Sequence, residues 1–176
     1  MTAQPRTDPL NVYLNDHLTG AFGGSALARR MADTHPHPAR ASALRRLALD
    51  VEQDRDDLVR IMNRLGVPVR HYRTWLGVAG ERLGRLKPNG TLVHRSPLSD
   101  LIELETMRVG VEGKAALWRA LRAIADQDAR LDPIDLDRLA QRADEQAHLL
   151  NGWHHEVSVN VLAPHGAAHH RSASTR

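Results

Sequence analysis

Four prolines, each at the start of a long helical pattern, constrain this chain more than any other feature of its sequence. They follow Asp8, His37, Ser96 and Asp132. Proline at the first position of a helix loses no hydrogen bond that the helix needs, and its fixed φ is already helical. Aspartate or serine before it can accept hydrogen bonds from N–H groups of the first turn. The pattern predicts helices over residues 9–34, 38–65, 97–127 and 133–161.

The connections between these helices differ in length. Short turns join the first helix to the second and the third to the fourth, so each pair is expected to form an antiparallel hairpin. The second and third helices are joined by a longer segment, in which residues 69–86 form a shorter helical pattern. We therefore expect an all-α, antiparallel four-helix bundle over residues 8–162. The polar, basic ends, 1–7 and 163–176, are expected to be disordered.

Composition excludes several classes of protein. The chain has 176 residues, enough for a real core, and its 3% aromatic content favours packed aliphatic helices. Zero cysteine rules out disulfides, thiolate metal sites and a cysteine nucleophile. The sequence contains no apolar run long enough for a transmembrane helix and no signal-peptide pattern at its start, so we expect a cytoplasmic protein. The net charge of +3 is too small to make nucleic acid an expected partner.

Ionisable residues fall on the predicted core faces of three helices. They are His17, Asp54, Arg55, Glu105 and Glu112. An unpaired charge is costly to bury, so these groups should meet one another, a metal ion or water. A buried network of ion pairs and hydrogen bonds is the interpretation we favour, and a metal or small-ligand site is the alternative.

The third predicted helix carries two apolar faces. One contains Leu98, Leu101, Ile102 and Val109 and is interrupted by Glu105 and Glu112; the other contains Leu104, Val111, Ala115 and Trp118. Two such faces predict a deeply buried helix with Trp118 shielded from solvent. Glycines on the first and third helices (Gly20, Gly24, Gly110 and Gly113) allow close backbone packing, which we favour over a pocket.

Three stretches resemble a family of uncharacterised actinobacterial ferritin-like proteins. They are Tyr13-Leu14-Asn15-Asp16-His17, Leu104-Glu105-x-x-Arg108-x-Gly110-x-x-Gly113-Lys114-x-x-Leu117-Trp118, and Leu83-Gly84-Arg85-Leu86-Lys87 with Arg95-Ser96-Pro97-Leu98. The resemblance covers about residues 10–160. It implies a bundle with carboxylates on two helices and Glu-x-x-His pairs on the other two, around two metal ions.

The resemblance implies metal ligands that this chain matches in part. Glu145-Gln-Ala-His148 matches one Glu-x-x-His pair, whereas Glu52-Gln-Asp-Arg55 has arginine in place of histidine. A guanidinium stays charged and only donates hydrogen bonds, so Arg55 cannot ligate a metal. We therefore expect a lost di-metal site in which Arg55 neutralises Glu105 and Glu52. The alternative is iron or manganese bound by Asp16, His17, Glu52, Glu105, Glu145 and His148.

The segment 64–96 is strongly basic, with seven Arg or Lys residues against one acid. Such a segment can bind an anionic membrane surface, a nucleic acid or an acidic partner. A crossover that packs on the bundle with its arginines in water is the interpretation we favour. The candidate anionic-partner surface comprises Arg70, Arg73, Arg82, Arg85 and Lys87.

Three hypotheses of function follow. The leading one is a non-enzymatic bundle without a cofactor, which acts through its surface or by self-association as a homo-oligomer. The second is a carboxylate-bridged metal protein that handles iron, oxygen or peroxide. The third is a binding module for an anionic partner through residues 64–96. The sequence contains no phosphate-binding loop, nucleophile elbow or helical zinc motif that would favour hydrolase, kinase or dinucleotide chemistry.

Overall fold

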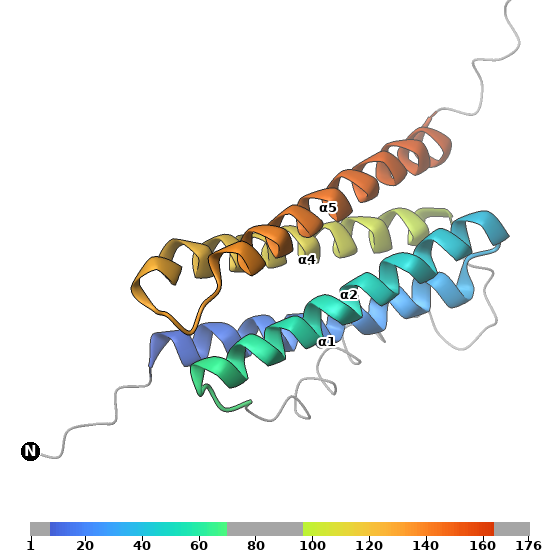
Figure 1. Cartoon of the computed structure of the whole chain (residues 1–176). Helices are drawn as coiled ribbons and strands as arrows, with labels where there is room; N and C mark the ends of the chain where they lie inside the picture. The colour runs from blue at the N-terminus through green and yellow to red at the C-terminus, as the bar shows by residue number, and fades with distance from the viewer. Residues whose placement is uncertain (1–7, 70–96, 164–176) are drawn as a thin grey trace, which may run out of the picture.

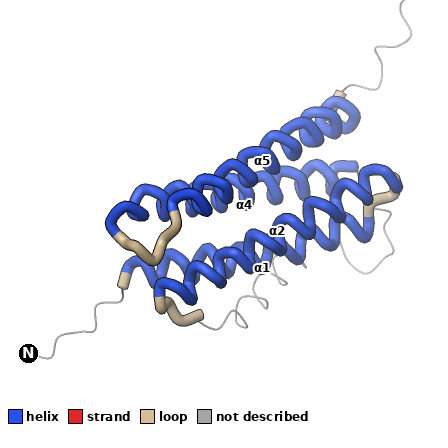
Figure 2. The backbone as a smooth tube through the Cα atoms, in the orientation of Figure 1, coloured by secondary structure: helices blue, strands red, loops and turns tan. Residues whose placement is uncertain are grey.

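The computed structural model describes residues 8–69 and 97–163. All regular structure in these ranges is helical (Figure 2), which confirms the all-α prediction. The long helices are α1 (Pro9–Thr34), α2 (Pro38–Leu65), α4 (Pro97–Ile124) and α5 (Pro133–Leu162), and a 3-10 turn, η1 (Ala125–Gln127), follows α4. Three predictions lie outside the described residues. They are the shorter helix over 69–86 (apart from Val69), the five basic residues of the candidate anionic-partner surface, and the disordered ends (apart from Ala163).

The helix ends follow the local signals of the sequence. Asp8 Oδ1 accepts a hydrogen bond from the Leu10 N–H at 3.0 Å, and Asp132 Oδ1 accepts one from the Ile134 N–H at 3.0 Å. These carboxylates satisfy N–H groups that the first turn of each helix leaves unpaired. Helix α2 ends at Gly66, whose φ of 68° is the left-handed conformation that glycine adopts without a Cβ clash.

The helices lie side by side in two pairs, α1 with α2 and α4 with α5, and α1 also packs on α4 (Figure 1). The start of α1 lies beside the end of α2, where Asn15 Nδ2 donates to the Pro68 carbonyl at 3.2 Å. The end of α1 lies beside the start of α4, where Arg30 Nη2 is 2.9 Å from Glu103 Oε1. None of the helices described in these ranges is both long and apolar enough to cross a membrane.

The apolar core has two parts that meet near the middle of the bundle. One part surrounds Trp118, which is fully buried as predicted, and the other surrounds Met107 and Leu150. On α2 the boundary falls between Val51 and Leu58, which belong to different parts. Polar side chains fill this boundary.

Helix α4 turns its second predicted apolar face inward. Leu104, Val111, Ala115 and Trp118 are buried, whereas Val109 of the first face is 73% exposed. The expectation that both faces are buried is therefore wrong for most of the first face. This orientation of α4 decides which of its charged residues enter the core.

Candidate site: a polar layer beside a cavity

Five side chains from three helices form a polar layer at mid-bundle. They are Asp54 and Asp57 of α2, Lys114 of α4, and Arg142 and Gln146 of α5. Arg142 donates from Nε to Asp54 Oδ1 at 2.7 Å and from Nη2 to Asp57 Oδ2 at 2.6 Å. Lys114 Nζ donates to Asp54 and to the Gln146 side-chain oxygen, and Gln146 Nε2 donates to Asp54 Oδ2 at 3.0 Å. Asp54 and Asp57 are only 1% and 3% exposed.

The charges of the polar layer balance, two carboxylates against one ammonium and one guanidinium. Burial alone would raise the pKa of Asp57, but hydrogen bonds from Arg142, Arg60 and Gln53 outweigh it and lower that pKa below its usual value. Burial lowers the pKa of Lys114, and the adjacent Asp54 carboxylate opposes that shift. Since each buried charge has an opposite charge and a hydrogen bond, the desolvation cost of the polar layer is largely offset.

Helical spacing brings these residues to the core. Asp54 and Asp57 are three residues apart, so both share the face of α2 that carries Leu58 and Ile61. The same spacing applies on the other helices. Lys114 follows Val111 by three residues on α4, and Arg142 follows Leu139 by three on α5. Of these five residues, the apolar stripes predict Asp54 and Gln146 on core faces. Asp57, Lys114 and Arg142 were not predicted there, although their three- or four-residue spacing from leucine, isoleucine or valine on the same helix was a usable signal.

The predicted interior cluster is only partly correct. Asp54 is buried as expected, but Glu105 is 54% exposed and its Oε1 lies 3.1 Å from His154 Nε2. Glu112 is exposed as well. Both glutamates belong to the face of α4 that points away from the core, which is the physical reason for the error.

Arg55 forms no direct ion pair with Glu105 or Glu52. Its Nη2 donates to Asp56 Oδ1 at 2.7 Å, and its guanidinium carbon lies 5.4 Å from the centre of the Phe22 ring. Glu52 accepts a hydrogen bond from Arg29 instead, which lowers the pKa of that carboxyl, and the nearby charge of Arg55 lowers it to a lesser extent. The predicted pairing is therefore wrong, because Arg55 lies at the side of α2 rather than on its most buried face.

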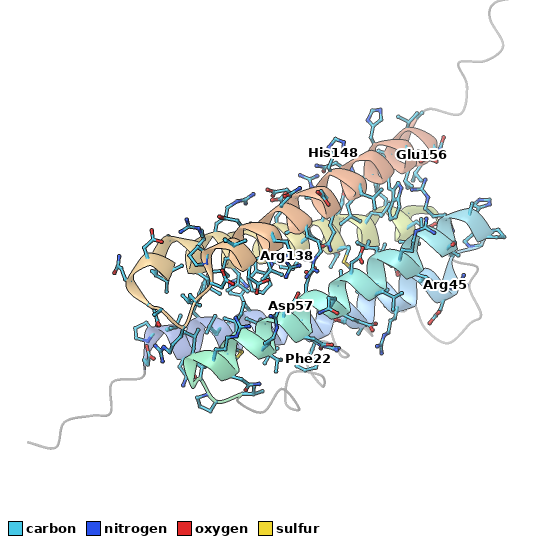
Figure 3. The ribbon with its side chains drawn as sticks, viewed as in Figure 1. Phe22, Arg45, Asp57, Arg138, His148 and Glu156 are labelled. Atoms are coloured by element: carbon cyan, nitrogen blue, oxygen red, sulfur yellow. The ribbon has the colours of Figure 1, made fainter. Side chains whose placement is uncertain are left out.

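The remaining predicted metal ligands are dispersed. Glu145 accepts from Gln141 Nε2 at 3.0 Å on the exposed side of α5, and His148 projects from the outer side of that helix (Figure 3). Asp16 and His17 lie on α1. In the part of the chain that the structure describes, no group of three or more histidine or acidic residues is arranged to hold a metal ion.

His17 is half-buried at the edge of the core. Its ring contacts the Tyr13 ring edge-on, with centroids 4.6 Å apart. Burial lowers the pKa of His17, and the adjacent Asp16 carboxylate opposes that shift. The neutral imidazole is therefore favoured at this position near neutral pH.

A cavity of about 580 Å³ lies next to the polar layer, between α1, α2 and α4. Its wall is mostly apolar and includes His17, Lys114 and Trp118. Five glycines also line it: Gly20, Gly23, Gly24, Gly110 and Gly113. A Cβ atom at Gly20, Gly23, Gly110 or Gly113 would have no atom of the described residues within 4 Å, apart from its own stretch of helix. Among the described residues, Gly20, Gly110 and Gly113 therefore face open space rather than the close backbone contact that was predicted, whereas a Cβ at Gly24 would lie 3.9 Å from Val51 Cγ1.

Comparison of the chain with models of known protein families, with curated proteins and with solved structures finds no match.

Proposed function

We propose that this protein is a non-enzymatic ferritin-like bundle that acts by binding, and that the polar layer stands in place of a di-metal centre. The contacts between helix ends support this topology. Asn15 and Pro68 bring the start of α1 to the end of α2, and Arg30 and Glu103 bring the end of α1 to the start of α4. These contacts fit two antiparallel hairpins with a crossover between α2 and α4, as in ferritin-like bundles. The absence of cysteine fits the reducing cytoplasm.

The observation that carries the proposal is the pairing of Asp54 and Asp57 with two cationic side chains. A carboxylate-bridged metal centre uses the oxygens of buried carboxylates as ligands. Here Lys114 and Arg142 donate to those oxygens. A divalent cation at the same place would be repelled by the ammonium and the guanidinium at short range. The polar layer thus gives the bundle internal charge balance without a metal ion.

The charged groups of the polar layer neutralise one another, which supports a binding role over a catalytic one. General bases and nucleophiles act through groups that can reach a substrate and exchange a proton with it. Asp54 and Asp57 are held by several donors each and are almost fully buried.

Metal analysis tests this proposal directly. The full chain is purified without added metal, its iron and manganese are measured by mass spectrometry, and its thermal unfolding is followed with and without a chelator. We expect far less than one metal ion per chain and a Tm that the chelator leaves unchanged. One or two iron or manganese ions per chain, or a Tm that falls with chelator, would instead support the alternative metal protein. Glu105→Gln and Glu145→Gln, which alter predicted ligands, should then lower the metal content.

A further inference from the structure

We propose that the cavity between α1 and α4 binds an elongated, uncharged apolar molecule, such as a long-chain alcohol or ester, with the ligand's oxygen atom next to Lys114. This site goes beyond the proposed function, because it concerns the cavity wall and does not depend on the metal content of the bundle. Four properties of the described residues carry it: the shape of the cavity, its glycine wall, a donor on Lys114, and the local charge balance.

The cavity is long and of the size of known ligand sites. Its lining extends from Asp16 to Leu27 along α1 and from Thr106 to Trp118 along α4. At a rise of 1.5 Å per residue, these stretches correspond to roughly 16–18 Å of helix. The volume of about 580 Å³ falls within the range of small-molecule pockets. An extended chain therefore fits this cavity better than a compact polar metabolite.

The glycines explain why the cavity exists. Glycine in a helix interior costs about 0.5–1 kcal/mol relative to alanine, so the five glycines of this wall need a compensating role. Close packing of helix backbones is the usual role of such glycines. At Gly20 and Gly113, however, no neighbouring atom of the described residues lies within 4 Å of the position that a Cβ would take. Room for a ligand between α1 and α4 is a role that fits this open space.

Lys114 supplies the polar contact. Its ammonium group has three N–H donors, and two of them bond Asp54 and the Gln146 oxygen. The third donor can bond an oxygen of a molecule in the cavity, since Lys114 forms part of the cavity wall. A carbonyl, ester or hydroxyl oxygen would accept this bond.

The local charges favour an uncharged ligand over a carboxylate. Lys114 is paired with Asp54, and Arg55 is paired with Asp56, so the cations on the wall are already neutralised. Asp16 adds a negative charge at the rim. A ligand carboxylate would thus bring an unbalanced negative charge into a mostly apolar space, which is costly.

The binding experiment uses the full chain and the neutral fluorophore N-phenyl-1-naphthylamine. We expect saturable binding with increased fluorescence, as the dye enters an apolar site. Tetradecan-1-ol should displace the dye at a concentration at least about tenfold below that needed for tetradecanoate. Equal or better displacement by tetradecanoate would overturn the assignment of an uncharged ligand.

Leucine substitutions locate the site. Gly20→Leu and Gly113→Leu place side chains in the cavity and should weaken dye binding at least about tenfold. Gly152→Leu is the matched control, because Gly152 lies on α5, does not line the cavity, and also has nothing described within 4 Å of a Cβ position. Urea unfolding of each variant verifies that it folds.

Two outcomes would overturn the proposal. The first is dye binding that is equal in the native chain and in both cavity variants, because the dye would then bind elsewhere. The second is no saturable dye binding by the native chain together with strong destabilisation by both cavity substitutions. In that case another part of the chain fills the space between α1 and α4.

Discussion

Arg142 of α5 binds Asp57 of α2, with 2.6 Å between the guanidinium Nη2 and the carboxylate Oδ2. The same guanidinium reaches Asp54 through Nε at 2.7 Å. One arginine thus joins two buried carboxylates across the boundary between the two pairs of helices; Asp57 appears on the α5 side of α2 in Figure 3. The planar, forked guanidinium suits this double contact, which the single ammonium of lysine could not make with the same geometry.

Arg142→Ala should destabilise the protein strongly, because it removes the cation that both buried carboxylates share. Breaking a buried ion pair on one side typically costs about 3–5 kcal/mol. We expect the lower end of that range, since the Arg142 side chain is 23% exposed and Asp57 keeps its bond to Arg60. Urea unfolding followed by circular dichroism measures the change.

Arg138→Ala is the matched control for that variant. Arg138 lies one turn earlier on α5, is 53% exposed and pairs with Asp135. Its loss should cost under about 1 kcal/mol, as for exposed ion pairs generally. Similar losses in the two variants would show that the polar layer contributes no special stability.

The pair of Asp54 and Lys114 should show strong energetic coupling. Each single change, Asp54→Leu or Lys114→Met, leaves a buried charge without its partner and should be clearly destabilising. The double variant strands neither charge, because Arg142 and Asp57 still balance each other. We expect the double variant to be more stable than the sum of the single effects predicts, by about 1–3 kcal/mol. Strict additivity in a double-mutant cycle of urea unfolding would contradict the pairing.

The sequence predicted the helices well because their start signals are local. Proline and its preceding cap act within one turn, so Asp8 and Asp132 could be read without tertiary information. The rotation of α4 could not be read in the same way. Its two apolar faces compete, and packing against α1 and α5 decides between them. Choosing the wrong face put Glu105 in the expected core and left out Lys114.

The same reasoning explains the polar layer. Asp54 was recognised because it interrupts an apolar stripe, but its partner depends on which side chain of another helix is opposite. Arg142 lies on α5, 88 residues away in the chain. Nothing in the local pattern of either helix selects this pair. The long-range contacts between helices are therefore the part of the site that could be identified only from the structure.

Arg55→Ala should be mild, in contrast to what the predicted pairing with Glu105 would require. Arg55 pairs with Asp56, which is largely exposed, and lies over the Phe22 ring. An ion pair with an exposed carboxylate and a cation–π contact together contribute about 1 kcal/mol. Thermal unfolding should therefore show a small fall in Tm. A loss as large as that of Arg142→Ala would mean that Arg55 has a buried carboxylate partner after all.

His17 should make the protein less stable as the pH falls below neutrality. Burial lowers its pKa in the folded state, whereas the unfolded chain has the ordinary value near 6.5. Between these two pKa values the unfolded state binds more protons, so stability declines as the pH drops through this window and levels off below the folded pKa. His17→Gln should reduce the difference in urea midpoint between pH 7.5 and pH 5. His148→Gln, at an exposed position of α5, is the control and should leave that difference unchanged.

Two glycine-to-alanine changes should shift stability in opposite directions. Gly66 ends α2 with a φ of 68°, and alanine in this left-handed conformation costs about 1–2 kcal/mol. Gly152 lies within α5, where a Cβ would have nothing described within 4 Å. Alanine there should stabilise the helix by about 0.5–1 kcal/mol, because it restricts the unfolded chain and has a higher helix propensity. Urea unfolding of both variants measures the shifts, and a stabilising Gly66→Ala would show that α2 does not end in the left-handed turn.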